Sequence, residues 1–399
     1  MIKASISAYR NAYLGLSPHM WWLALVMFVN RAGTMVLPFM TVYLREEMHY
    51  SIASAGWEIA FFGGGAILGN FIGGKLTDRI GFYPIQFWSL FLNGVLFIVL
   101  GWMQTFGQIA ACMFTIGMVG ESFRPANAAA IAHYSLPGNR TRSYSLNRLA
   151  INLGFSIGPA IGGLLSYHAL FWVDGITCML AALLLRVALP TTVRIHEHPI
   201  GDTKRMSSSV WRDKVYMRFI FFVFVSALCF LQMFSLLPVF YKEQLDFSKP
   251  LVGALLALNG LIIVIIEMVL VFKLEGKRAP VEYISLGSLF IGLSYLLLNL
   301  PLAGLTVALI AMTAITVGEM LMFPFINTFW VNRSNERNRG QYAALFSMSF
   351  AAAQVLAPTF GSQVVQHWSY HILWYTVFVL CAIASIGFYS FNKNKLSHE

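Results

Sequence analysis

The sequence predicts an all-α polytopic membrane protein with twelve transmembrane helices in two pseudo-symmetric six-helix bundles. Three observations lead to this fold class: the composition, a series of apolar stretches, and an internal repeat. Of the 399 residues, 58% are hydrophobic and only 11% are charged, whereas a soluble domain carries about 25% charged residues. A chain so poor in charge is suited to an outer surface that meets hydrocarbon.

The apolar stretches each have the length of a membrane span, because crossing a hydrocarbon layer about 30 Å thick takes about 20 helical residues. Lipid offers no partner to free backbone groups, so we expect every stretch to be helical. In chain order the twelve expected spans are Met20–Leu44, Ser54–Leu76, Pro84–Met103, Gln108–Ala132, Ser145–Ser166, Ala169–Leu189, Met217–Tyr241, Pro250–Lys273, Tyr283–Leu300, Leu302–Trp330, Tyr342–Val365 and His371–Phe391.

The basic residues indicate the orientation. With the N-terminus in the cytoplasm, only Arg45, Lys242 and Lys249 of the 27 lysines and arginines fall on the outer side, and Arg31 and Arg124 fall within spans. All the others lie on the inner side, which is the asymmetry of a multi-pass protein with both termini cytoplasmic. It explains the net charge of +10 without nucleic acid. We expect the protein in the cell inner (cytoplasmic) membrane.

An internal repeat supports the division into two bundles. The halves match in order at an offset of about 199 residues, and six spans per half give both halves the same orientation, with a binding cavity expected between them at mid-membrane. The expected domains are an N-terminal bundle (1–189), a cytoplasmic linker (190–215) and a C-terminal bundle (216–399). Matching positions are Pro38 and Pro238, Glu121 and Glu319, Pro125 and Pro324, Asn139 and Asn338, and Pro159 and Pro358.

Cofactor and enzyme chemistry find no support in the sequence. The cysteines show no paired spacing and are expected to be apolar packing residues, so neither a disulfide framework nor a metal site is implied. No nucleophile elbow or phosphate loop occurs in or beside the spans. We expect no cofactor and no catalysis, but a monomer surrounded by membrane lipid. The four cysteines are Cys112, Cys178, Cys229 and Cys381.

Ionisable residues within spans are functional candidates, because a charge at mid-membrane costs a few kcal/mol even on permissive scales. Glu121 and Arg124 are three residues apart and therefore share a helix face. A carboxylate that exchanges an arginine partner for a proton is what proton coupling requires. Glu319, the repeat-mate of Glu121, is the second proton-coupling candidate. A static ion pair with a structural role is the alternative.

Three further charged residues are candidates for substrate binding or coupling. Arg31 lies near the middle of the first span and can pair with a glutamate or bind an anionic substrate. Glu58 and Glu267 lie nearer to span ends, from which they can also reach an interface. Asp174, near the outer end of the sixth span, is expected to be an interface or cap residue.

The loop after the second span carries a family signature. Residues 73–81 read GGKLTDRIG, which resembles the G-x-L-x-D-R-x-G loop of the major facilitator superfamily in Asp78, Arg79 and Gly81. Phe82 and Tyr83 stand where that family has two basic residues. The resemblance implies a cytoplasmic latch that favours the outward-facing state. The alternative is ordinary basic flanking charge at the inner side.

The fifth span resembles the antiporter motif of the drug:proton antiporter branch, G-x-x-x-G-P-x-x-G-G. Glycines four apart leave a groove for close helix approach, and proline bends the helix. Generic helix packing is the alternative explanation. The resemblance favours export and extends over the whole chain through the spans, central loop and repeat. The motif residues are Gly154, Gly158, Pro159, Gly162 and Gly163.

Together these patterns predict a secondary active transporter that exports small amphipathic or apolar compounds in exchange for protons by alternating access. A second hypothesis is proton-coupled import of a peptide, siderophore or other small nutrient, which the two intramembrane arginines would suit. A third is a lipid flippase or a non-transporting receptor. The sequence does not name the cargo.

Overall fold

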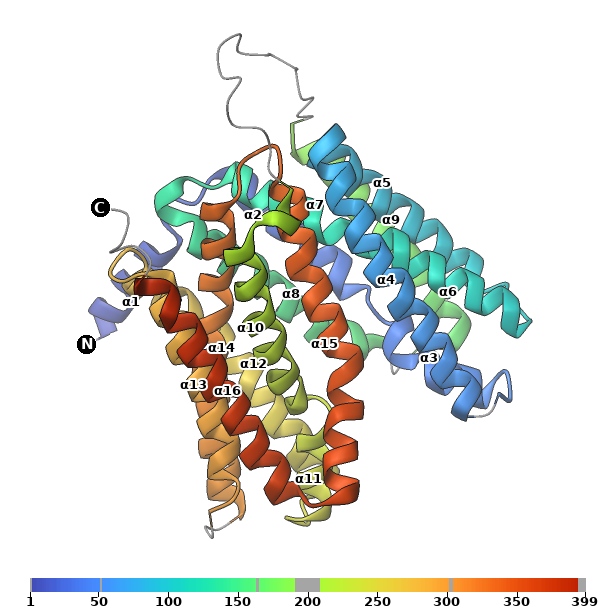
Figure 1. The fold of residues 1–399 in the computed structure, drawn as a ribbon. Coiled ribbons are helices and arrows are strands. Elements are labelled where there is room, and N and C mark those ends of the chain that lie inside the picture. The colour runs from blue at the N-terminus through green and yellow to red at the C-terminus, as the bar shows by residue number, and fades with distance from the viewer. Residues whose placement is uncertain (1, 51, 163–164, 191–208, 301–303, 394–399) are drawn as a thin grey trace. The chain divides into compact units, whose positions relative to one another are not determined.

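The computed structural model describes residues 2–50, 52–162, 165–190, 209–300 and 304–393 (Figure 1). These residues form helices joined by short turns, and no strand occurs among them. Each of the twelve stretches expected to cross the membrane contains a helix. The all-α polytopic fold class is therefore confirmed.

The helices follow the order of the expected spans, preceded by one short N-terminal helix that the hydropathy pattern did not predict. They are α1 (Ile2–Tyr13), α2 (Pro18–Ala32), α3 (Val36–Glu46), α4 (Ile52–Ile80), α5 (Phe82–Leu100), α6 (Phe106–Glu121), α7 (Phe123–Tyr134), η1 (Pro137–Asn139), α8 (Arg140–Gly162), α9 (Tyr167–Ala188), η2 (Val210–Arg212), α10 (Lys214–Phe230), η3 (Leu231–Met233), α11 (Leu236–Glu243), α12 (Lys249–Leu274), α13 (Pro280–Leu297), α14 (Gly304–Arg333), α15 (Arg339–His367) and α16 (Tyr370–Lys393).

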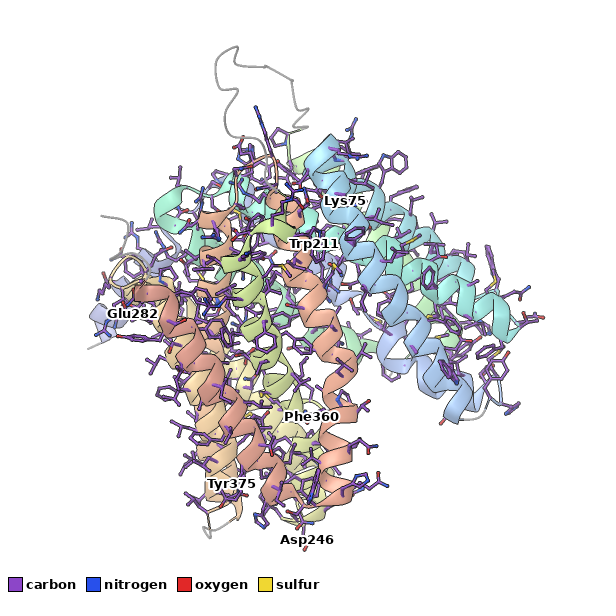
Figure 2. All side chains as sticks on the ribbon, viewed as in Figure 1. Lys75, Trp211, Asp246, Glu282, Phe360 and Tyr375 are labelled. Carbon is purple, nitrogen blue, oxygen red and sulfur yellow. The ribbon has the colours of Figure 1, made fainter. Side chains whose placement is uncertain are left out.

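Nine helical segments among the described residues are long and apolar enough to cross a membrane. The other three expected spans correspond to the α2–α3 pair, to α4 and to α8. Many large apolar side chains point outward from the helices, as Tyr375 of α16 does in Figure 2. The side chains of Val187 and Ile386 are 78% and 72% exposed. Such surfaces fit contact with lipid better than contact with water.

Three of the expected spans are broken helices. The first span divides at Gly33–Met35 into α2 and α3, and its repeat-mate, the seventh span, divides through η3 into α10 and α11. The fourth span divides at Ser122 into α6 and α7. Pro125 contributes to that break because it has no N–H to donate to the carbonyl of Glu121. Its repeat-mate Pro324 lies inside the unbroken helix α14.

The chain forms two compact units. One unit contains residues 16–213 and 334–351, and the other contains residues 1–15, 214–333 and 352–399. The expected boundaries at residues 189 and 216 stay a prediction, since residues 191–208 of the expected linker lie outside the described part of the chain. For brevity, the first is called the N-unit and the second the C-unit.

Two of the packed helix pairs recur in both units, which agrees with the internal repeat. In the N-unit the second span packs on the fourth (α4 on α6), and the third on the sixth (α5 on α9). In the C-unit the corresponding pairs are α12 on α14 and α13 on α16, and α13 and α16 run side by side in Figure 1.

All four cysteines are buried free thiols, as expected for packing residues.

Glycines allow the close approach of α4 and α6. A Cβ atom added to Gly69 would lie 2.8 Å from Cα of Met118, and one added to Gly73 would lie 2.6 Å from Cα of Ser122. Contacts this short do not occur in folded proteins, so these positions accept only glycine unless the helices separate. The glycine-rich face of α4 thus fixes the position of the helix that carries Glu121.

Candidate functional site

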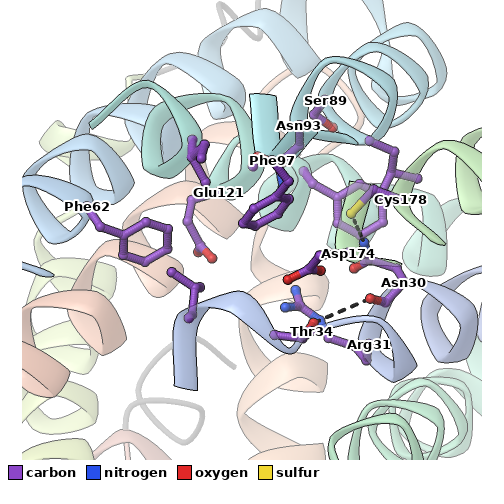
Figure 3. A pocket seen from close by; sticks show the side chains of 15 residues that line it. Asn30, Arg31, Thr34, Phe62, Ser89, Asn93, Phe97, Glu121, Asp174 and Cys178 are labelled. Atoms are coloured by element: carbon purple, nitrogen blue, oxygen red, sulfur yellow. Dashed lines mark hydrogen bonds between the residues drawn. The ribbon is translucent and has the colours of Figure 1, made fainter. Parts of the chain in front are cut away.

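A cavity inside the N-unit brings Arg31 and Glu121 together with a third charged residue, Asp174 (Figure 3). Water-sized molecules have access to about 40 Å³ of it, and one water needs roughly 10–15 Å³ on the same measure. The cavity therefore has room for a few waters in this conformation. Its wall consists of Asn30, Arg31, Thr34, Leu37, Phe62, Ser89, Leu90, Asn93, Phe97, Ile116, Gly120, Glu121, Phe123, Asp174 and Cys178.

Arg31 lies in the last turn of α2, directly before the break in the first span. Its guanidinium group sits over the ring of Phe155 at 5.4 Å from the ring centre. Its Nε atom is buried and has no hydrogen-bond partner among the described residues. A buried guanidinium with an unused donor can recruit a carboxylate, an anionic ligand group or a water.

Glu121 and Arg124 form the ion pair that their spacing predicts. The Nε atom of Arg124 lies 2.5 Å from Oε2 of Glu121, and the two side chains are 40% and 12% exposed, respectively. The hydroxyl of Ser122, between them, donates to the carbonyls of Met118 and Val119 and so closes the last turn of α6. The pair thus spans the break in the fourth span, with Glu121 on the cavity wall.

Asp174 lies in the same cavity wall and is 1% exposed. Its Oδ2 atom accepts hydrogen bonds from the backbone N–H groups of Met35 at 3.2 Å and Val36 at 2.9 Å. These amides open α3, so Asp174 of α9 caps a helix of another span, and the expectation of a cap residue is met. Its place beside Arg31 was not predicted, although the rule that selected the glutamates applies equally to an aspartate in an apolar span.

Two asparagines in the cavity were also missed by sequence reasoning. Asn30 donates from Nδ2 to the Cys178 sulfur at 3.4 Å, and Asn93 has a buried Oδ1 without a hydrogen-bond partner among the described residues. Neutral amides inside spans give only a weak sequence signal, because they occur widely in helix packing. They add donors and acceptors to the wall of the cavity that Arg31 lines.

Glu319 belongs to the C-unit and is 7% exposed. Its Oε2 atom accepts a hydrogen bond from Nδ2 of Asn259 at 2.8 Å, which joins α14 to α12. The same Nδ2 donates to Oγ1 of Thr316 at 3.0 Å. The amide of Asn259 is therefore one partner of the Glu319 carboxylate.

Glu58 and Glu267 are both buried rather than extended to an interface. Glu58 on α4 is 0% exposed, and neither carboxylate oxygen has a hydrogen-bond partner among the described residues. Glu267 on α12 is 2% exposed. It lies near α1, which packs on α12 and whose Tyr9 hydroxyl donates to the carbonyl of Ile265. Neither glutamate lines the cavity around Arg31.

The short helix α1 brings a titratable group close to Glu267. Burial raises the pKa of Tyr13, at the end of α1, and the neighbouring Tyr9 and Glu267 add to that rise. The Tyr13 hydroxyl is therefore neutral at physiological pH. It can donate a proton in a hydrogen bond without carrying charge.

The residues of the expected latch lie where α4 meets the start of α15. Asp78 accepts hydrogen bonds from the backbone N–H of Gly340 at 2.6 Å and of Gln341 at 3.0 Å. A carboxylate at a helix N-terminus is stabilised by the helix dipole. Gly81, which follows α4, has a φ of +91°, a conformation that favours glycine. The side chain of Arg79 is exposed.

The glycines of the antiporter motif lie along the break in the first span. A Cβ on Gly154 would lie 2.6 Å from Cβ of Arg31, and one on Gly162 would lie 2.9 Å from Cε2 of Phe39. A Cβ on Gly158 would lie 3.1 Å from the carbonyl oxygens of Ala32 and Thr34. Gly163 lies outside the described residues, and so does the side chain of Pro159. The motif thus supports the helix end that carries Arg31.

Relatives of known sequence are transporters. The chain is 25% identical over 370 residues to a Na(+), Li(+), K(+)/H(+) antiporter of Planococcus maritimus, covering 83% of this chain and 85% of that protein. It is 21% identical over 337 residues to multidrug resistance protein 2 of Bacillus subtilis, covering 82% and 83% of the two chains.

Solved structures share the fold. The human organic anion transporter MFSD10 superposes with a TM-score of 0.72 at 15% identity, covering 92% of this chain and 98% of that chain. A bacterial homologue of the iron transporter ferroportin, in an outward-facing state, gives 0.73 at 15% identity, covering 94% and 99%. The family model described as Major Facilitator Superfamily matches residues 23–349. The chain therefore belongs to the major facilitator superfamily of transporters.

Proposed function

We propose that this superfamily member is a proton-coupled secondary active exporter of small amphipathic or apolar compounds. It works by alternating access in the cytoplasmic membrane as a monomer with both termini inside. Glu121 and Glu319 are the proton-carrying groups, and Arg31 and Arg124 are the cations that respond to their charge. Glu58 and Glu267 stay candidates for coupling because both are buried acids in spans.

The ion pair between Glu121 and Arg124 is the observation that carries this proposal. Glu121 has one cation bound to it and a second, Arg31, on the wall of the same cavity. When Glu121 takes up a proton, it loses most of its attraction for Arg124. A charge then becomes uncompensated in the membrane, where such a charge is costly, and the helices can rearrange to restore pairing.

The motif residues fit a mechanism that moves the halves of broken spans. Asp78 holds the start of α15 through two backbone hydrogen bonds, with Arg79 and Gly81 completing the latch. Gly154, Gly158 and Gly162 leave the α2–α3 break in close contact with α8. In the proposal, Pro159 and Gly163 complete the antiporter motif, and a shift of α8 changes the position of Arg31.

The relatives support proton antiport as the type of transport. Proteins named for multidrug resistance and for cation/proton antiport both match over most of the chain. The antiporter of Planococcus maritimus favours a second candidate cargo, a monovalent cation exchanged for protons. Acidic side chains buried in spans suit either cargo, so the probes of the experiment include both.

The experiment uses everted membrane vesicles from cells that produce the protein, with an imposed pH gradient, acid inside. Ethidium and tetraphenylphosphonium serve as organic probes, and NaCl, KCl and LiCl as cation probes. Export predicts that addition of a transported probe dissipates the gradient. Symport in the import direction predicts probe uptake by right-side-out vesicles under an inward proton gradient.

Variants connect the flux to the site. Glu121→Gln and Glu319→Gln are expected to abolish proton-linked flux while the protein still inserts into the membrane. Glu47→Gln is the matched control, because Glu47 is an exposed acidic residue directly after α3. This variant should behave as wild type. Unchanged coupled flux in both glutamate variants would refute the assignment. Lipid translocation without proton flux would support the flippase instead.

A further inference from the structure

The broken first span is held by a carboxylate from another helix. Its outer half, α3, begins with two backbone N–H groups, of Met35 and Val36, that the helix itself cannot satisfy. Within a membrane such groups need a partner supplied by the protein. Asp174 of α9 supplies it by accepting both hydrogen bonds on one oxygen, Oδ2.

The same carboxyl group lies among the groups that the proposed function uses. Asp174 is 1% exposed and lines the cavity with Arg31 and Glu121, and it interacts electrostatically with Arg31. Figure 3 shows the Asp174 carboxylate turned toward the Arg31 side chain. Because both hydrogen bonds go to Oδ2, the other oxygen is left to bind a proton from the cavity.

The titratable groups around Asp174 come from three helices. Arg31 is contributed by α2 and Glu121 by α6, and Cys178 lies one turn along α9. The helix α5 contributes only uncharged side chains to this wall, of which Ser89 and Asn93 are polar, and α3 contributes Leu37 and its backbone amides. Arg31 is thus the cation that favours an ionised Asp174, and Glu121 is the anion that opposes it.

We propose that Asp174 is a proton-binding residue of the transport cycle that positions α3, so that protonation of its carboxylate loosens the start of this helix. The inference rests on the proposed function. One proton from bulk water adds to the carboxylate and yields a neutral carboxyl group, and it is released to water on the other side. The N–H groups of Met35 and Val36 then lose a charged acceptor and with it the stronger kind of hydrogen bond.

The consequence for Arg31 follows from the chain connectivity. Arg31 is the residue before the last one of α2, and only Ala32 and the break at Gly33–Met35 separate it from α3. While Asp174 is ionised, it fixes α3 and attracts Arg31 at the same time. Once Asp174 is neutral, both restraints weaken, and Arg31 turns to Glu121 as the remaining carboxylate of the cavity. Protonation is thereby coupled to the bend of a span.

The first test compares Asp174→Asn with wild type in proteoliposomes loaded with ethidium. Asparagine keeps an acceptor oxygen for α3 but cannot take up a proton. We expect ethidium exchange without a gradient to persist with an altered pH profile, while proton-driven ethidium accumulation is lost. Asp174→Glu, which keeps a titratable group, is expected to restore part of the accumulation. A variant with wild-type accumulation and a wild-type pH profile would show that Asp174 is a cap only.

The second test uses the wild-type protein, so it does not depend on the folding of a variant. Amide hydrogen exchange of the peptide covering residues 33–46 is measured at several pH values and corrected for the intrinsic exchange rate. The proposal predicts faster corrected exchange at the start of α3 at low pH, over the range in which transport changes. Constant protection across that range would overturn it.

The two proposals fail in different ways. If wild-type protein moves no protons with any probe, the proposed function itself is wrong. If wild-type protein is coupled, and Glu121→Gln uncouples it while Asp174→Asn does not, only the role of Asp174 is wrong.

Discussion

The Nε atom of Arg124 lies 2.5 Å from Oε2 of Glu121, and the two residues stand on opposite sides of the break between α6 and α7. The carboxylate also lies on the wall of a cavity that contains a second arginine, Arg31. An acid with one bound cation and another nearby has two alternative partners. The proposed mechanism depends on whether Glu121 pairs with Arg124 or with Arg31.

The charge of Arg31 should be required for coupling. We predict that Arg31→Met abolishes proton-driven transport, because the cavity wall then contains no cation with which Glu121 can pair. Arg31→Lys should retain part of the activity, since the charge is kept while the planar guanidinium is lost. Transport is measured in everted vesicles with the probe that wild type exports.

Arg186→Met is the control for this prediction, because Arg186 is exposed at the end of α9. It should transport normally. Full activity of Arg31→Met would remove Arg31 from the coupling scheme and leave it with a packing role against Phe155.

The contact between α4 and α6 should not tolerate a methyl group. We predict that Gly69→Ala lowers the free energy of unfolding in detergent by about 1–3 kcal/mol, the usual cost of overpacking a close contact. The added Cβ would lie 2.8 Å from Cα of Met118, on the helix backbone, which cannot rotate away.

Gly260→Ala on α12 is the matched control, since a Cβ there meets nothing within 4 Å. In a helix interior, alanine is better than glycine by roughly 0.5–1 kcal/mol, so this variant should be as stable as wild type or more stable. Equal effects of the two substitutions on the free energy of unfolding would contradict the close contact between α4 and α6.

The contact from Asp78 to α15 should contribute to stability as an N-terminal helix cap does. We predict that Asp78→Ala lowers the free energy of unfolding by about 0.5–2 kcal/mol. Asp78→Asn should have a smaller effect, because it keeps one of the two acceptor oxygens that bind Gly340 and Gln341. Chemical denaturation in detergent gives both values, and a reversed order would argue against the cap.

Glu58 should destabilise the fold. Its two carboxylate oxygens are buried without hydrogen-bond partners among the described residues, and an unsatisfied buried polar group costs about 1–3 kcal/mol. We predict that Glu58→Met raises the midpoint of thermal unfolding. Glu58→Gln, which keeps a polar group in the same place, should raise it less. A lower midpoint for Glu58→Met would mean that the carboxyl group makes a stabilising interaction.

The sequence was most informative where one simple physical rule governs a long segment. Each of the twelve predicted spans contains a helix, because hydrocarbon demands both apolar side chains and internal backbone hydrogen bonds. The pairing of Glu121 with Arg124 followed from their spacing alone. The shared positions of the two halves likewise anticipated the repeated helix pairs.

The breaks at Gly33–Met35 and at η3 could not be predicted, because hydropathy measures apolar length and is blind to where backbone bonds are interrupted. The break before Val36 is stabilised by Asp174, which is 138 residues away in sequence. That partnership exists only in the folded chain. For the same reason the sequence did not predict which residues surround Arg31. The helix α1 was missed because it is too short and too polar for a span.

Proton release on cargo binding tests the central claim most directly. Purified protein in detergent and weak buffer, with a pH-sensitive dye, is mixed with a probe that the vesicle experiments have shown to be transported. The account predicts that wild type releases protons when the probe binds, and that the double variant Glu121→Gln, Glu319→Gln binds the probe but releases fewer protons, because Asp174 is the proton-binding acid that remains. Proton release of wild-type size from the double variant would contradict the account.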